Sequence, residues 1–131
     1  MKVTIVEITD REHRLVRTRS QLGDLAMTWR GAPLPVPGAR LDVELDLGPG
    51  SSRWEEDVVR VADGSISGVE QGDGLFYLTG LADYAGDRIL YVKPAADCLI
   101  SLVLDVDIGE EGAFGMVRVR SRVLEAWPTN T

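Results

Sequence analysis

Strict alternation of apolar and charged residues is the clearest pattern in the chain. In residues 40–47 (RLDVELDL) every second position is Leu or Val, and acids occupy most of the positions between them. Residues 116–124 (MVRVRSRVL) repeat the pattern, with mainly valine on one face and arginine on the other. A period of two is typical of a β-strand with one buried and one exposed face. Both segments are therefore predicted to be strands.

Residues 75–105 predict a three-stranded antiparallel meander. They contain three runs of apolar, β-branched and aromatic residues, separated by the segments ADYAGD and PAAD. Runs of this kind between turn-forming residues favour consecutive strands. We expect this meander to be the centre of the fold and its side chains to belong to the core.

The N-terminal part of the chain predicts a strand over residues 2–8 and a hairpin over residues 15–29. The hairpin is expected to turn at Gly23 and Asp24, because glycine adopts positive φ without steric cost. Residues 32–38 (APLPVPG) follow as a stiff connection, since proline fixes φ and lacks an N–H donor.

The segment 53–61 supports two interpretations. Residues 52–55 (SRWE) fit a helix capping box, and Trp54, Val58 and Val61 have helical spacing, which predicts a short helix. The alternative is an irregular loop that leads into a short strand.

These patterns predict an all-β fold: a small antiparallel barrel of the OB type, with an added N-terminal strand and hairpin and at most one short helix near 53–61. Short strands with frequent turn signals are typical of barrels, and a split sandwich is the alternative. We expect residues 1–131 to form a single domain. Within it, residues 1–31 would be the N-terminal layer and residues 40–127 the barrel.

Composition and charge narrow the class of protein. The 131 residues carry a net charge of −7, which disfavours nucleic acid and anionic membranes as partners. A lone cysteine excludes an internal disulfide and favours a reducing compartment. The N-terminus lacks the apolar segment of a signal peptide, and no stretch is long enough for a membrane helix. A cytoplasmic protein is expected.

Few residues offer catalytic or metal chemistry. The only histidine, His13, lies in a charged turn, and Cys98 opens an apolar strand, so a nucleophile with an adjacent base is not indicated. One histidine and one cysteine cannot build a zinc site. Four acids lie close together after the meander: Asp105, Asp107, Glu110 and Glu111. Without the spacing of a calcium loop they predict a solvated acidic loop. We expect no enzyme activity, no metal and no cofactor.

Two arginine stripes are the main candidate contact surface. Arg118, Arg120 and Arg122 share one face of one predicted strand, and Arg17 and Arg19 form a shorter stripe of the same kind. One interpretation is a surface that follows a phosphate backbone, as on nucleic-acid-binding OB barrels, with Phe76 and Tyr77 stacking bases. The other, which we favour, is structural. The acids Asp42, Glu44 and Asp46 have the same spacing and opposite sign, so a cross-strand salt ladder can form.

The tryptophans have similar alternatives. Core packing is the usual role of this residue, whereas an exposed tryptophan favours a protein contact. Trp54 is the best candidate for a contact, because acids surround it in a loop-rich segment, and Trp127 is expected to cover the core.

Three parts of the chain together resemble small uncharacterised bacterial β-barrel proteins of the OB type: LGDLAMTWRG, GARLDVELDL, and SLVLDV leading into VRVRSRVLEAWPTN. The resemblance implies a barrel fold and transfers no functional residue.

The leading hypothesis is a non-enzymatic acidic protein of the adaptor or immunity type. It would bind another protein, with a basic one as the natural partner, because acidic surfaces associate quickly with basic partners. The alternative is an OB-like binder of single-stranded nucleic acid that uses the stripe of Arg118, Arg120 and Arg122. A barrel with a carboxylate-lined pocket is the corresponding enzyme hypothesis. A homodimer is also possible, since sheet edges must be paired or covered.

Overall fold

The computed structural model describes residues 1–109 and 115–129 and is all-β, with no helix among these residues. Its strands are β1 (Lys2–Asp10), β2 (Leu15–Ser20), β3 (Gly23–Trp29), β4 (Arg40–Ser52), β5 (Val58–Arg60), β6 (Gly68–Gly72), β7 (Leu75–Gly86), β8 (Ile89–Ala95), β9 (Cys98–Leu104), β10 (Gly115–Ser121) and β11 (Leu124–Pro128). The predicted fold class is confirmed, and so is the meander, which β7, β8 and β9 form in that order.

Five strands close into a barrel in the order β1–β2–β3–β11–β4, and pairing of β4 with β1 completes the ring. All of these contacts are antiparallel except the one between β3 and β11. The hairpin of β2 and β3 turns at residues 21–22, two residues earlier than expected. Ser20 pairs with Gly23, whose φ of 96° suits glycine at the end of the turn.

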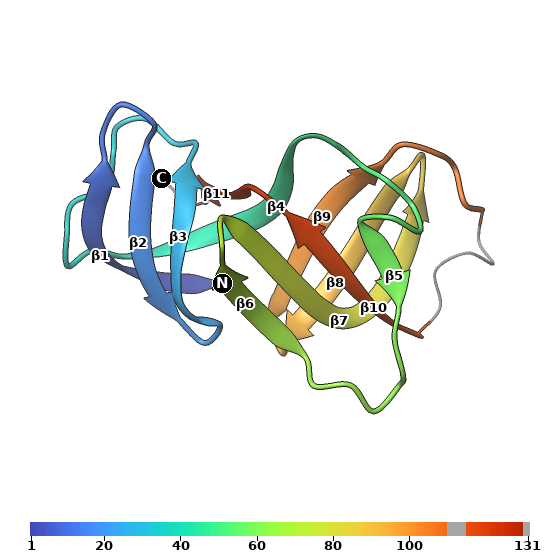
Figure 1. The fold of residues 1–131 in the computed structure, drawn as a ribbon. Helices are drawn as coiled ribbons and strands as arrows, with labels where there is room; N and C mark the ends of the chain where they lie inside the picture. Colours follow the sequence, from blue (N-terminus) through green and yellow to red (C-terminus); the bar gives the residue numbers. More distant parts are fainter. Residues whose placement is uncertain (110–114, 130–131) are drawn as a thin grey trace.

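The remaining strands form a second, curved sheet in the order β4–β9–β8–β7–β10–β5, with β6 paired to β7. Figure 1 shows the two parts side by side, with β4 running from one into the other. This strand is 13 residues long and pairs with β1 and β11 in the ring and with β9 in the second sheet. The two parts therefore share one strand.

The closed ring consists of different strands from those expected. Residues 1–31, predicted as a layer beside the barrel, supply three of its five strands, and the segment 40–127 supplies β4 and β11. The physical reason is that β11, at the end of the chain, pairs with both β3 and β4. A pairing across such a sequence distance leaves no trace in the local pattern.

The helix proposed for residues 53–61 does not form. Residues 53–57 make a tight turn in which Glu55 has a φ of 70°, a value that a right-handed helix does not contain. The Asp57 carboxylate accepts the Arg53 N–H at 2.9 Å, and Val58 begins the short strand β5. The alternative, a loop that leads into a strand, is confirmed.

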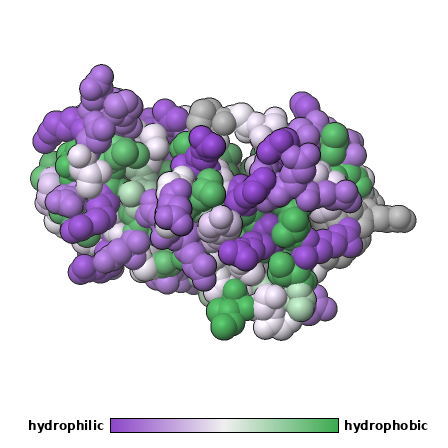
Figure 2. Space-filling model, in the orientation of Figure 1, coloured by the Kyte–Doolittle hydropathy of each residue, from purple (hydrophilic) through white to green (hydrophobic). Residues whose placement is uncertain are grey.

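One continuous apolar cluster fills both parts of the molecule. Alternate residues of each long strand point into it, such as Val43 and Leu45 of β4, or Ile100 and Leu102 of β9. On the face drawn in Figure 2, the surface is mostly hydrophilic with hydrophobic residues in small groups. At the bend of β7 a side chain on Gly80 would come within 2.3 Å of the backbone oxygen of Lys93. Glycine at this position allows β7 and β8 to approach closely.

Candidate functional site

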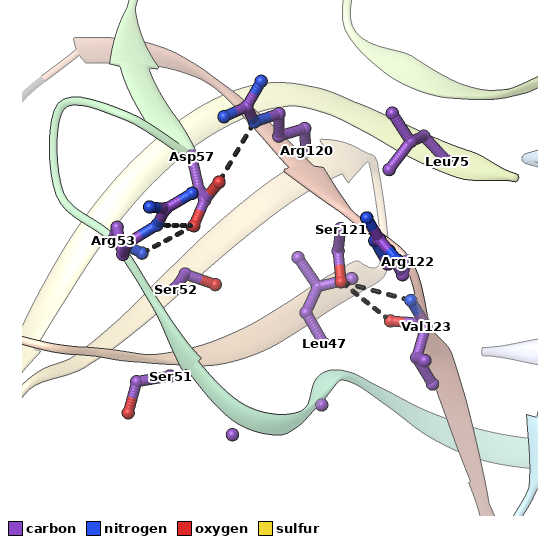
Figure 3. A pocket seen from close by; sticks show the side chains of 12 residues that line it. Leu47, Ser51, Ser52, Arg53, Asp57, Leu75, Arg120, Ser121, Arg122 and Val123 are labelled. Carbon is purple, nitrogen blue, oxygen red and sulfur yellow. Dashed lines mark hydrogen bonds and ion pairs between the residues drawn. The ribbon is translucent and has the colours of Figure 1, made fainter. Parts of the chain in front are cut away.

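A cleft of about 540 Å³ opens where β4 and β10 diverge (Figure 3). At one end, Leu47 of β4 pairs with Leu124 of β11. Beyond Leu47 the pairing of β4 with β9 resumes only at Ser52, so residues 48–51 bulge away from the sheet. The bulge forms one wall of the cleft, and residues 120–123 form the other.

Three arginines and three serines line this cleft. They are Arg53, Arg120, Arg122, Ser51, Ser52 and Ser121, and we call the cavity that they line the arginine cleft. Guanidinium and hydroxyl groups both donate hydrogen bonds, and a guanidinium can bind a carboxylate or phosphate through two parallel bonds. The volume lies within the range that protein pockets use for small ligands. The arrangement therefore suits an anionic group.

Asp57 is the one acid among the residues that line the arginine cleft. Its carboxylate accepts the Arg53 backbone N–H at 2.9 Å and the Arg120 Nε–H at 3.0 Å. Burial alone raises the pKa of Asp57, but hydrogen bonds from Arg53 and Arg120 outweigh it, so the pKa lies below its ordinary value. Asp57 is therefore ionised at neutral pH and neutralises part of the charge of two arginines.

Arg122 retains its charge for a ligand. Its side chain is exposed and makes no ion pair or hydrogen bond with any residue in the described ranges. Figure 3 shows Arg53 and Arg120 joined to Asp57 by dashed lines, whereas Arg122 lies beside Ser121 and Val123. An anion that enters the arginine cleft therefore finds one cation that needs no displacement of an existing partner.

The predicted stripe on β10 is divided between two surfaces. Arg120 and Arg122 line the arginine cleft, but Arg118 lies over the Tyr77 ring, 4.6 Å from its centre. This contact covers a face of Tyr77, and Phe76 is buried. Neither of the aromatic residues proposed to stack bases is therefore free to do so.

The salt ladder favoured from the sequence does not form. The strand β10 pairs with β7 and β5, and not with the acidic strand β4. The acids have other neighbours: Asp42 binds Lys2 at 2.9 Å, and Asp46 lies opposite Glu125 of β11. The prediction was wrong because charge and period reveal which residues share a face, but not which strands are neighbours.

The shorter arginine stripe lies on the barrel ring and is already paired. Arg17 contacts Glu7 of β1 at 3.3 Å, and Arg19 contacts Asp24 of β3 at 3.0 Å. Both arginines are exposed on β2, and neither lines the arginine cleft. The structure thus separates two stripes that the sequence placed in one class.

Trp54 is half-buried and packs against the core, and its backbone N–H donates to Asp105 at 3.1 Å. The sequence favoured it as the exposed tryptophan, but that property belongs to Trp127, which is 46% exposed. Trp127 was expected to cover the core. The two roles are exchanged because β11 turns Leu124 and Ala126 inward, which directs Trp127 to solvent.

Residues with other chemistry have ordinary surroundings. His13 contacts the Asp10 carboxylate at 2.8 Å in an exposed turn. Cys98 is buried, and burial raises the pKa of its thiol. In the acidic loop the Tyr84 hydroxyl donates to Asp107 at 2.6 Å, while Glu110 and Glu111 lie outside the described residues.

Within residues 1–109 and 115–129, no group of His, Cys, Asp and Glu is arranged to hold a metal ion. Over the same ranges, no helix has the length and apolar character needed to cross a membrane.

Comparisons with protein-family models, with curated proteins and with solved structures find no match for this chain. The resemblance to OB-like proteins stays a prediction, and function must be argued from the geometry of the site.

Sequence reasoning missed half of the cleft. Arg53, Ser51 and Asp57 are as much part of it as Arg120, yet they lie far away along the chain. The one signal near them is the segment GPGSSR, because glycines and serines beside an arginine are common in anion-binding loops. Alone, such a segment is only weak evidence for a site.

Proposed function

We propose that the protein is a non-enzymatic binding protein of the adaptor or immunity type, which contacts another protein through the arginine cleft. The ligand would be an anionic group of that partner, such as a cluster of acidic side chains. The observation that carries the proposal is the position of Arg122: a cation with no partner among the described residues, on the wall of a cavity that Arg53 and Arg120 also line.

A protein carboxylate fits the arginine cleft better than a nucleic acid does. Proteins that bind single strands without sequence preference combine a basic groove with aromatic platforms. No aromatic residue lines the arginine cleft, and the chain has a net charge of −7. The alternative, an OB-like binder of single-stranded nucleic acid, is supported by the adjacent exposed positions of Arg120 and Arg122. A reducing, cytoplasmic location belongs to the same proposal and agrees with the buried thiol of Cys98.

The test is fluorescence anisotropy at low salt with two labelled probes, a short oligoglutamate peptide and a single-stranded oligothymidine. We expect the peptide to bind the unaltered protein. Arg122→Glu should weaken this binding by about tenfold or more, since it places a negative charge against the acidic peptide in the cleft. Arg122 has no partner within residues 1–109 and 115–129, so its replacement should leave stability unchanged.

Arg40→Glu is the matched control. Arg40 is also exposed, and its replacement changes the net charge equally, but it does not line the arginine cleft. Equal weakening by the two variants would indicate attraction by net charge and overturn the proposal. Binding of oligothymidine but not of the peptide, lost in Arg122→Glu, would favour the nucleic-acid alternative.

A further inference from the structure

The ring and the second sheet share one continuous outer side, formed by the outward side chains of β11, β4, β9, β8 and β7. One row of side chains crosses five strands of this face, because Glu125 pairs with Asp46, Asp46 with Ser101, Ser101 with Tyr91, and Tyr91 with Asp83. Residues directly opposite each other in a sheet point to the same side. The row therefore places three carboxyl groups, a hydroxyl and a phenol on one side of the strands, which we call the outer face; Glu125 is buried there, and Asp83 is exposed.

Acids on the outer face have unused capacity to accept hydrogen bonds. Asp46 has a buried oxygen, Oδ1, without a hydrogen-bond partner among the described residues. Burial and the nearby Glu125 carboxylate raise the pKa of Asp46, and Arg30 pairs with Glu125. Asp83 makes no ion pair with any described residue. Asp83 is exposed, so a cation of a partner can reach it.

Large apolar side chains flank the acidic row. Four of them are each at least 40% exposed: Leu81, Leu99, Val103 and Trp127. They make up half of the exposed large hydrophobic residues of the described chain. Each lies on a strand of the outer face, and Trp127 is paired with the exposed Glu44. Single exposed hydrophobic residues are normal, but several of them around acids are typical of a protein contact.

Two shallow hollows shape this surface. One, of about 380 Å³, is lined by Glu44, Asp97 and Leu99 among others. The other, of about 300 Å³, includes Asp46, Tyr91, Ser101 and Val103. Both hollows therefore combine a carboxyl group with an apolar wall, which suits a long basic side chain that has an apolar stem.

We infer that the outer face is a docking surface for a segment of a partner protein in which basic and apolar side chains alternate. Charge complementarity carries this inference. The acids Glu44, Asp46, Asp83 and Asp97 lie among the apolar residues, and the cations near them include Lys93 and the N-terminal ammonium of Met1. This surface is separate from the arginine cleft and has the opposite charge, so the two sites select different chemical groups.

A labelled peptide of alternating lysine and leucine is the probe, measured by fluorescence anisotropy on the full chain. We expect the peptide to bind and its affinity to fall as salt rises. Asp83→Lys and Leu99→Ser should each weaken this binding about fivefold or more. Asp83 and Leu99 are exposed, so neither change should prevent folding. Glu12→Lys is the matched control, because Glu12 is an exposed acid in a turn of the ring, away from the outer face.

Three results would overturn the inference. The peptide could fail to bind, or Asp83→Lys and Glu12→Lys could weaken it equally, which would indicate net charge alone. In the third case, analytical ultracentrifugation would show a dimer that Leu99→Ser dissociates, and the outer face would then belong to a second copy of the chain. Loss of peptide binding in Asp83→Lys with unchanged oligoglutamate binding would separate this surface from the arginine cleft.

Discussion

The arginines of the barrel ring and those of the second sheet have the same sequence pattern and different surroundings. Arg17 and Arg19 lie on β2, which has β1 on one side and β3 on the other, and each neighbour supplies an acid within 3.3 Å. Arg120, near the end of β10, and Arg122, just after it, lie beyond the part of β10 that pairs with β5. A closed ring surrounds each strand with two neighbours that pair both arginines, whereas at the open seam Asp57 binds Arg120 and Arg122 has no partner among the described residues. The position of a stripe in the sheet, rather than its spacing, decides whether it is structural.

Asp57→Ala should have the largest effect on this comparison. The replacement removes the acceptor that holds Arg53 and Arg120 and releases a turn. Loss of hydrogen bonds to a charged group should cost about 1–3 kcal/mol of unfolding free energy. The same variant should bind oligoglutamate more tightly, since two arginines become free. Urea denaturation and anisotropy measure the two effects.

Asp24→Ala is the control in the ring. Asp24 contacts Arg19 on the exposed surface, so its loss should lower stability less than the loss of Asp57 and leave oligoglutamate binding unchanged. If the two variants proved equal in both measurements, the distinction between paired and open stripes would be wrong.

The response to pH should differ between the two regions. Asp46, in the ring, has a raised pKa, so the folded state holds its proton more tightly than the unfolded state does. Its contribution to stability is present at acidic pH and is lost as pH rises above 3.8 through the folded pKa. Asp57 has a lowered pKa and acts in the opposite direction: its contribution is present above 3.8 and is lost as pH falls through the folded pKa.

Asp46→Asn isolates the first effect, because an amide has no proton to lose in this range. As pH rises from about 4 to 7, the unaltered protein should lose unfolding free energy relative to Asp46→Asn. Urea titrations at a series of pH values measure it. A difference that stays constant with pH would show that burial and the Glu125 carboxylate do not raise the pKa of Asp46.

Arg122→Ala should have the smallest effect on stability. An exposed side chain without a partner contributes within about 0.5 kcal/mol. Thermal and urea denaturation should therefore match the unaltered protein, even though oligoglutamate binding decreases. A clear loss of stability would assign Arg122 a structural contact and would remove the distinction between β2 and β10.

The exposure of individual side chains could be predicted well from the alternating segments. Val117 and Val119 point inward and Arg118 and Arg120 outward, as the period of two requires, and Val43 and Leu45 follow the same rule. Local steric and hydrophobic preferences determine this property, since each strand must turn its apolar face from water whatever its neighbours are. The meander was equally predictable, because consecutive hairpins depend on short turns.

The candidate site could not be predicted, because it depends on pairing between distant segments. Nothing near Arg122 indicates that Ser51 and Arg53 lie across a cavity from it, and nothing near Asp46 indicates that Glu125 is its neighbour. Strand order results from the burial of the whole core, a property of all strands together. The sequence by itself determined an all-β chain with charged outer faces. Only the tertiary structure decided which charges meet, which remain unpaired and therefore where a partner could bind.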